Sequence, residues 1–151
     1  RRSLYTYWKR IQPPPSMVIF DAASRNQCTV KRQSTNTPLQ ALVLLNDPQF
    51  VEASRALAYR MLKEGGNDPR GRIAYAFRWA TSRKPDPEEL KILVGLFEDE
   101  MTEFRNHPER AAAFLRIGEF SRQVDGNAQE LAAYGVVANT IINLSESLQK
   151  N

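Results

Sequence analysis

The sequence predicts a mainly α-helical protein, a compact bundle of five to six helices with an irregular, partly extended N-terminal arm. The first observation is a repeated start signal, in which a short polar residue precedes Pro and then an amphipathic run. Pro suits the first helical position because its missing N–H is not needed there, and the preceding side chain can accept a hydrogen bond from a free amide. The second observation is apolar spacing of three and four residues between these signals, which is the period of a helix.

The N-terminal arm, residues 1–34, differs from the rest of the chain in composition. The run "PPP" at 13–15 favours extended backbone, while "SLYTYW" and "CTVKR" are rich in β-formers, so we expect an irregular segment with one short strand pair. Residues 1–32 hold seven Lys or Arg and the single acid Asp21, a local charge of +6. We therefore expect a basic arm packed on the bundle of residues 35–151, together forming one domain.

The stretch "TNTPLQALVLLNDPQF", residues 35–50, contains two start signals. Thr37 precedes Pro38, and Gln40 at the third helical position completes a capping box. The run "ALVLL" is then expected to be a short buried helix, which ends where Asp47 and Pro48 begin the next one. Thr37, Gln40 and Asp47 are thus explained as structural polar residues.

Four further helices are expected along the chain. Helix 48–64 ends at Gly65-Gly66, helix 69–82 follows Asp68-Pro69, and helix 87–104 follows Asp86-Pro87 and has Glu89 in its first turn. The last long helix, about 128–148, begins after Asn127. His107-Pro108 is a weaker start signal between the third and fourth of these.

The residue types that usually carry chemistry are sparse. His107 is the only histidine and Cys28 the only cysteine, so we expect no metal site, no Ser-His-Asp arrangement and no internal disulfide. His107 is interpreted as a surface loop residue and Cys28 as a small buried apolar residue. The acids at 98–103 are interpreted as a solvated helix face.

Two buried amides are expected on the last helix. Asn139 and Asn143 are four residues apart, so they share one face of an otherwise apolar helix. Buried amides need partners. We interpret both as structural, with the backbone of the arm as partner, and keep ligand binding as the alternative.

The junction between the arm and the first helix holds the candidate binding or docking residues. Thr35 and Asn36 cap nothing obvious and follow directly from the basic arm. Guanidinium groups pair with carboxylates and other anions through bidentate hydrogen bonds. The candidate residues are Asp21, Arg25, Arg32 and Asn36.

Nearly the whole chain resembles a known family. From "RRSLYTYWKR" through "FDAASRNQCTVKRQSTNTPLQALVLLNDPQF" and "RIAYAFRWATSRKPDPEEL" to "VANTIINLSES", it resembles the C-terminal part of the planctomycete-cytochrome-associated domain of unknown function, number fifteen fifty-three. It departs from the family pattern at Ala23, Phe120 and Ser147. The family's usual motif residues fall on Arg1, Arg2, Phe20, Asp21, Arg25, Cys28, Arg32, Thr35, Asn36, Thr37, Pro38, Gln40, Asn46 and Asn143.

The resemblance implies a setting but no established reaction. Members are large exported bacterial proteins that often carry a cytochrome-c-like haem module, so a periplasmic or secreted location is expected and the chain is expected to be a fragment of a larger protein. The haem attachment motif CxxCH is absent from this sequence, so we expect no cofactor in this chain and haem in an upstream module. No stretch has the roughly 18 apolar residues of a membrane span.

Three hypotheses of function follow. The leading one is a structural or docking module whose partners are the remainder of the parent polypeptide and a cytochrome-type module. The alternative is an active site shared with the upstream domain, in which Asp21, Arg25, Arg32 and Asn36 bind an anionic or sugar-like substrate. The third is binding of single-stranded nucleic acid, whose bases would stack on the aromatic residues of the basic arm. We do not expect nucleic acid as the main partner, because a local charge of +6 is modest for a nucleic-acid-binding surface.

Overall fold

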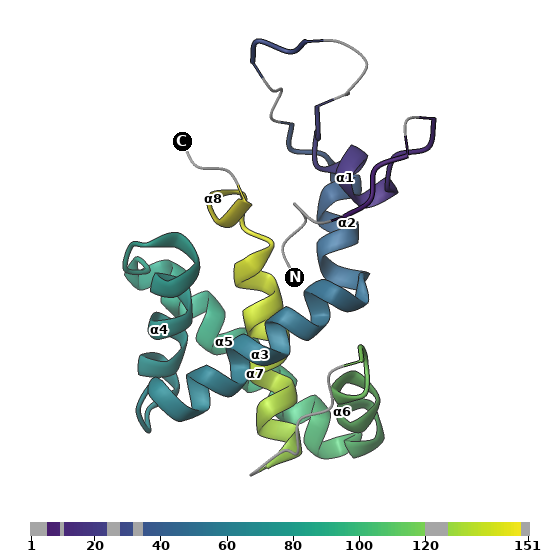
Figure 1. The fold of residues 1–151 in the computed structure, drawn as a ribbon. Coiled ribbons are helices and arrows are strands. Elements are labelled where there is room, and N and C mark those ends of the chain that lie inside the picture. The colour runs from purple at the N-terminus through teal and green to yellow at the C-terminus, as the bar shows by residue number, and fades with distance from the viewer. Residues whose placement is uncertain (1–5, 10, 24–27, 32–34, 120–126, 149–151) are drawn as a thin grey trace. The chain divides into compact units, whose positions relative to one another are not determined.

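The computed structural model describes residues 6–9, 11–23, 28–31, 35–119 and 127–148, and over these ranges the fold is entirely helical (Figure 1). The prediction of a mainly α protein is confirmed, and six of the eight helices in these ranges have eight or more residues. The helices are α1 (Pro15–Ile19), α2 (Pro38–Asn46), α3 (Pro48–Glu64), α4 (Pro69–Thr81), α5 (Pro87–Asn106), α6 (Pro108–Leu115), α7 (Ala128–Ile142) and α8 (Ser145–Leu148).

The start signals of the sequence are confirmed. Helices α2 to α6 each begin at the expected Pro. Asp47 Oδ1 accepts the Gln49 amide at 2.8 Å, and Asp68 Oδ2 accepts the Gly71 amide at 3.2 Å. Each side chain therefore satisfies one of the free N–H groups of its first turn.

Three expectations about the elements were wrong. The described part of the arm has no strand and contains the short helix α1, which begins at Pro15 because Pro is compatible with the first helical position. In α2 only Leu44 is fully buried, whereas Leu42 and Leu45 are exposed, so "ALVLL" is not a buried helix. The last long helix is interrupted after Ile142, where Asn143 is the C-cap of α7 and α8 follows.

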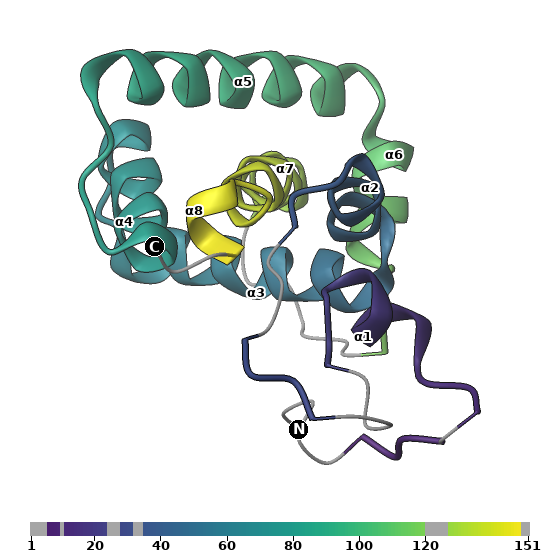
Figure 2. The same cartoon turned by 90° about the horizontal axis from the view of Figure 1, so that it is seen from above.

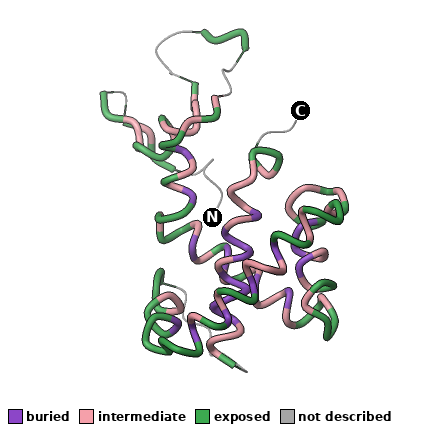
Figure 3. Tube along the Cα trace, turned by 180° about the vertical axis from the view of Figure 1, so that it is seen from behind, coloured by how far each residue is buried: buried purple, intermediate pink, exposed green. Residues whose placement is uncertain are grey.

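The chain divides into two compact units, Arg1–Val43 (unit 1) and Leu44–Asn151 (unit 2). In unit 2, α7 lies in the middle and is surrounded by α3, α4, α5 and α6, which all contact it (Figure 2). Most residues of α7 from Leu131 onward are buried, as the tube coloured by burial shows (Figure 3). A helix that is apolar on almost every side is stable in water only when other elements cover it.

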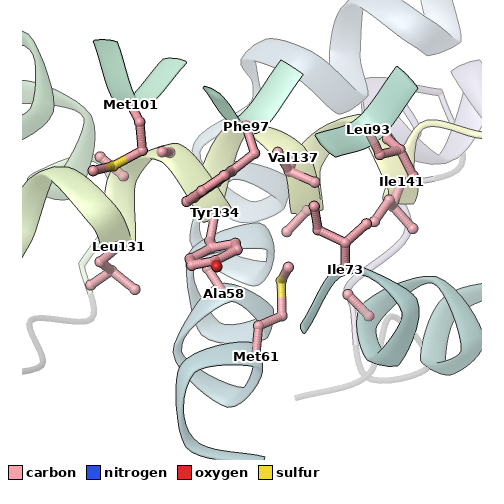
Figure 4. Close-up of a cluster of buried hydrophobic side chains, with 14 of the residues drawn as sticks. Ala58, Met61, Ile73, Leu93, Phe97, Met101, Leu131, Tyr134, Val137 and Ile141 are labelled. Carbon is pink, nitrogen blue, oxygen red and sulfur yellow. The ribbon is translucent and has the colours of Figure 1, made fainter. Parts of the chain in front are cut away.

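Tyr134 of α7 is at the centre of the core of unit 2 (Figure 4). Its side chain is fully buried, and its ring stacks on Phe97 of α5 with 4.3 Å between ring centroids. The hydroxyl lies 3.5 Å from Nη1 of Arg72, and the same nitrogen donates to Glu130 Oε1 at 2.6 Å. Burial raises the pKa of Tyr134 above its ordinary value, so the phenol stays neutral in this position.

Two helix-interior glycines have opposite surroundings. A Cβ on Gly135 of α7 would lie 2.6 Å from Cε1 of Phe114, which packs from α6, so the small residue permits the close approach of the two helices. A Cβ on Gly95 of α5 would have no heavy atom within 4 Å. Packing therefore explains Gly135 and does not explain Gly95.

We expect Gly95→Ala and Gly135→Ala to change stability in opposite directions. Alanine is favoured over glycine inside a helix by about 1 kcal/mol, and Gly95→Ala should gain this amount because space is free. Overpacking typically costs about 1–3 kcal/mol, so Gly135→Ala should lose about 1 kcal/mol net. Urea unfolding followed by circular dichroism measures both free energies.

The control for Gly135→Ala is the double variant with Phe114→Leu, which shortens the opposing side chain. If the clash with Phe114 is the cause, the double variant loses less stability than the sum of the two single variants. Equal stabilisation by both Gly→Ala changes would contradict this account of the α6 and α7 contact.

Candidate functional site

The conformation of Asp21 directs its carboxylate toward residues that come much later in the sequence. Helix α1 ends in a turn in which the Asp21 amide donates to the Val18 carbonyl and the Ala22 amide donates to the Met17 carbonyl. Asp21 has a φ of 54°, in the left-handed region. Asp is one of the few non-glycine residues that adopt this region readily.

One oxygen of Asp21 gathers three donors. Asp21 Oδ2 accepts the Thr35 amide at 2.8 Å, the Thr35 hydroxyl at 2.7 Å and Gln40 Nε2 at 3.4 Å. The Thr35 hydroxyl also accepts from Gln40 Nε2 at 3.1 Å. Thr35 thus donates two hydrogen bonds, from its amide and its hydroxyl, and accepts one at its hydroxyl oxygen, all within unit 1.

Gln40 joins this arrangement to the first turn of α2. Its side chain is buried, its Oε1 accepts the Thr37 amide at 3.1 Å, and its own amide donates to the Thr37 hydroxyl at 3.3 Å. This reciprocal pair is the capping box that the sequence predicts. Gln40 Nε2 also donates to the Ile19 carbonyl at 2.8 Å. We call Asp21, Thr35, Thr37, Gln40 and the Ile19 carbonyl the Asp21 cluster.

The structure brings together only part of the predicted candidate set. Asp21 belongs to the cluster, and Asn36 lies between Thr35 and Thr37 with an exposed side chain. Arg25 and Arg32 lie outside the described residues. A common site of all four residues therefore stays a prediction. Thr35 is a partner of Asp21 that was not among the predicted candidates, and the one signal for it was that Thr35 caps no helix.

The predicted structural amides of α7 differ from each other. Asn139 is 6% exposed, and its Nδ2 donates to the Leu45 carbonyl at 3.2 Å, so its partner is the end of α2 rather than the arm. Its Oδ1 is buried without a hydrogen-bond partner. Asn143 is partly exposed and ends α7 by donating its amide to the Asn139 carbonyl at 3.0 Å.

Arg83 connects three segments of unit 2. Its Nη1 and Nη2 donate to the two carboxylate oxygens of Glu89 at 2.8 and 2.7 Å, and its Nε donates to Glu146 Oε2 at 2.9 Å. The Asp86 amide donates to Glu89 Oε2 at 2.7 Å. The hydrogen bonds from Arg83, followed by the one from the Asp86 backbone, lower the pKa of Glu89 to about 2.

The remaining chemistry-bearing residues are dispersed. Cys28 is exposed, which corrects the expectation of a buried thiol, and His107 is exposed between α5 and α6. Over the described ranges, no group of three or more His, Cys, Asp or Glu side chains is arranged to hold a metal ion. In the same ranges, no helix combines the length and apolar character needed to cross a membrane.

Comparison with protein families gives a match over the N-terminal part of the chain. The family model described as PSD1, protein of unknown function (DUF1553), matches residues 1–97. This range contains unit 1, the whole of α3 and α4, and the first part of α5. No curated protein and no solved structure matches the chain.

We expect Gln40→Glu to destabilise the Asp21 cluster. The new carboxylate can still accept the Thr37 amide through one oxygen. Its other oxygen replaces the Nε2 group that donates to the Ile19 carbonyl and to Asp21, so both acceptors lose this donor. Leaving buried polar groups unpaired costs about 1–3 kcal/mol. Hydrogen exchange at the Thr35 amide, measured by NMR, should accelerate by roughly fivefold to 150-fold.

Gln49→Glu is the matched control. Gln49 is exposed in the first turn of α3, where a negative side chain is favourable. This variant should leave exchange at Thr35 unchanged. Equal exchange rates in both variants would show that the cluster does not hold Thr35.

We expect Glu89 to make unfolding pH-dependent under acid conditions. Its pKa is depressed in the folded chain, to about 2, so its contribution to stability is present above the unfolded value of about 4.3 and is lost as pH falls toward 2. Glu89→Gln should therefore reduce the acid slope of the unfolding free energy between these pH values. Urea titrations at several pH values measure this slope.

Glu88→Gln controls for the loss of one acid in the same helical turn. Glu88 is exposed and is not part of the Arg83 network. An acid slope that falls as much in Glu88→Gln as in Glu89→Gln would contradict the assignment to Glu89.

Proposed function

This chain belongs to the PSD1 family of proteins of unknown function, and from that premise we propose that it is a non-catalytic helical docking module. The observation that carries the proposal is the distribution of side chains in unit 1. Four of its polar motif residues, Asp21, Thr35, Thr37 and Gln40, hydrogen-bond one another in the Asp21 cluster. Six of the large apolar residues described in unit 1 are exposed.

The apolar surface of unit 1 supports a docking role. Leu39 and Leu42 of α2 are three residues apart on one face of the helix, and they are 53% and 57% exposed. All of the buried hydrophobic residues among the described ones belong to unit 2. Contiguous exposed apolar patches mark sites of interaction with proteins, membranes or ligands. The exposed hydrophobic residues of unit 1 are Tyr7, Ile11, Val18, Val30, Leu39 and Leu42.

The geometry of Asp21 favours docking over the shared active site. A substrate-binding carboxylate presents its oxygens to the ligand, whereas Asp21 Oδ2 already accepts from Thr35 and Gln40. The hydroxyl of Thr35 is likewise used by two partners within the cluster. The cluster is therefore better suited to fix the chain between α1 and α2 than to perform chemistry.

The proposal includes the cellular setting that the resemblance implies. The parent protein would be exported to the periplasm or secreted, with haem in a cytochrome-type module outside this chain. The partners would be that module and the remainder of the parent polypeptide. Support for this setting comes from the family resemblance alone, and a secretion signal with a CxxCH motif in the complete open reading frame would test it.

We expect Leu42→Asp to weaken binding to the remainder of the parent polypeptide. Leu42 is exposed, so the change should cost little folding stability, whereas a charge in an apolar interface remains unpaired. The dissociation constant should rise by at least about tenfold, which is 1.4 kcal/mol. Isothermal titration calorimetry with the separately expressed upstream region measures it.

Ile92→Asp introduces the same charge at an exposed Ile of α5 and should leave binding unchanged. The absence of any complex at low salt would refute the docking proposal. Equal weakening by both variants would place the interface elsewhere.

A further inference from the structure

Helix α4 and its flanks form a basic segment. Residues 69–85 contain five Lys or Arg and no Asp or Glu. Arg72 and Arg83 are paired with acids of α7, α5 and α8. Arg70, Arg78 and Lys84 are exposed, and the described part of the chain provides no ion pair for them. These three bases are available to a partner.

An exposed tryptophan lies on the solvent face of this helix. Trp79 is 58% exposed, which is unusual for a side chain that has so much apolar surface. The guanidinium of Arg60, from α3, lies over its ring at 3.9 Å from the centroid. This cation–π contact covers part of the ring and limits its rotation.

Arg60 is itself held by two further side chains. Its Nη2 donates to Glu64 Oε2 at 3.0 Å and to the Tyr75 hydroxyl at 2.9 Å, and that hydroxyl donates to Glu64. The hydrogen bonds from Arg60 and then from Tyr75 lower the pKa of Glu64, so its carboxylate remains charged. Arg60 is therefore positioned over the tryptophan ring before any partner binds.

A hollow of about 440 Å³ adjoins the ring and is lined by Tyr75, Arg78 and Trp79. Their spacing of three and four residues places them on one face of α4. Trp, Tyr and Arg are the residue types that contribute most binding energy in protein interfaces. Their ordering in the free protein lowers the entropy lost on binding. We call these three residues and Arg60 the α4 aromatic face.

We propose that the α4 aromatic face binds an acidic polypeptide segment of a partner protein. A carboxylate of the segment would take the bidentate hydrogen bonds of Arg78, whose guanidinium has the matching fork geometry. A neighbouring apolar or aromatic side chain would lie in the hollow against Trp79. Arg70 and Lys84 would add weaker, salt-sensitive attraction at the two ends of the helix.

The number of available charges favours a polypeptide over a nucleic acid. Nucleic-acid interfaces commonly neutralise about six to ten phosphates, whereas only Arg70, Arg78 and Lys84 are available here. Glu64 neutralises Arg60, so Arg60 adds no net positive charge for the phosphates of a nucleic acid. Three bases are sufficient for one or two carboxylates.

This inference is separate from the proposed docking of unit 1. The α4 aromatic face belongs to unit 2, and its partner is selected by charge and an aromatic ring rather than by the leucines of α2. Either proposal can fail while the other stands, because the substitutions that test them are in different helices.

The test uses a random copolymer of glutamate and tyrosine as the probe, immobilised for biolayer interferometry with the full chain. Polyglutamate and oligothymidylate are the comparison probes. We expect salt-sensitive binding to the copolymer that is tighter than to polyglutamate. Trp79→Ala and Arg78→Glu should each weaken it by at least about tenfold, and Arg78→Lys should weaken it less than Arg78→Glu.

Arg105→Glu is the matched control, because Arg105 is an exposed base of α5 and the substitution changes the charge by the same amount. It should leave copolymer affinity within about twofold, since Arg105 does not line the hollow of Tyr75, Arg78 and Trp79 and acts there only through screened attraction. Circular dichroism verifies that each variant is folded. Equal loss in Arg105→Glu, or unchanged binding in Trp79→Ala, would overturn the proposal.

A second readout uses the fluorescence of Trp79. The chain has two tryptophans, so Trp8→Phe leaves Trp79 as the single emitter. Its emission should change on adding the copolymer, with excitation at a wavelength where tyrosine does not absorb. Three outcomes would overturn the proposal: no binding at low salt, tighter binding of oligothymidylate through the same residues, or an emission change with protein concentration alone, which would indicate a second copy as the occupant.

Discussion

The burial of α7 is the constraint on which unit 2 depends. The helix is apolar on almost every side, so it cannot remain at a surface, and α3, α4, α5 and α6 must cover it together. Its small residues let these helices approach, and Gly135 shows this most directly because the ring of Phe114 takes the place of a side chain. Tyr134 then fills the space between α7 and α5 by stacking on Phe97. The outer helices can therefore be polar on their solvent faces without loss of the core.

Burying α7 also fixes where polar groups must be placed. The hydroxyl of Tyr134 lies near the edge of the core, where Arg72 reaches it and Glu130 balances the charge. Asn139 donates to the carbonyl of Leu45, which ties α7 to the end of α2. Its Oδ1 has no partner, and buried acceptors of this kind are uncommon in folded proteins. The polar groups of α7 thus connect the core to its neighbours at a few defined points.

The sequence predicted the features of this fold that depend on local chemistry. The Thr or Asp before Pro38, Pro48, Pro69 and Pro87 identifies each helix start because capping involves residues within one turn. Exposure in α2 could not be predicted in this way, because its apolar pattern is the same whether or not another element covers Leu42. The hydrogen bond between Asp21 and Gln40 spans nineteen residues and depends on the left-handed conformation of Asp21, which no local pattern indicates. The sequence therefore predicted the capping box of Thr37 and Gln40. It did not predict the hydrogen bonds of Thr35 with Asp21 and Gln40.

The polar residues that the sequence pattern identifies are not the residues that are exposed for binding a partner. Thr37, Gln40 and Asp47 have hydrogen-bond partners that account for their presence without chemistry. Trp79 is not explained by folding, since burying its exposed area would favour stability and the chain leaves it in solvent. Its contact with Arg60 keeps the ring in one orientation, which lowers the entropy cost of binding without burying the ring. A surface that is ordered and still exposed is suited to recognition, whereas a polar cluster whose members hydrogen-bond one another is suited to holding the chain.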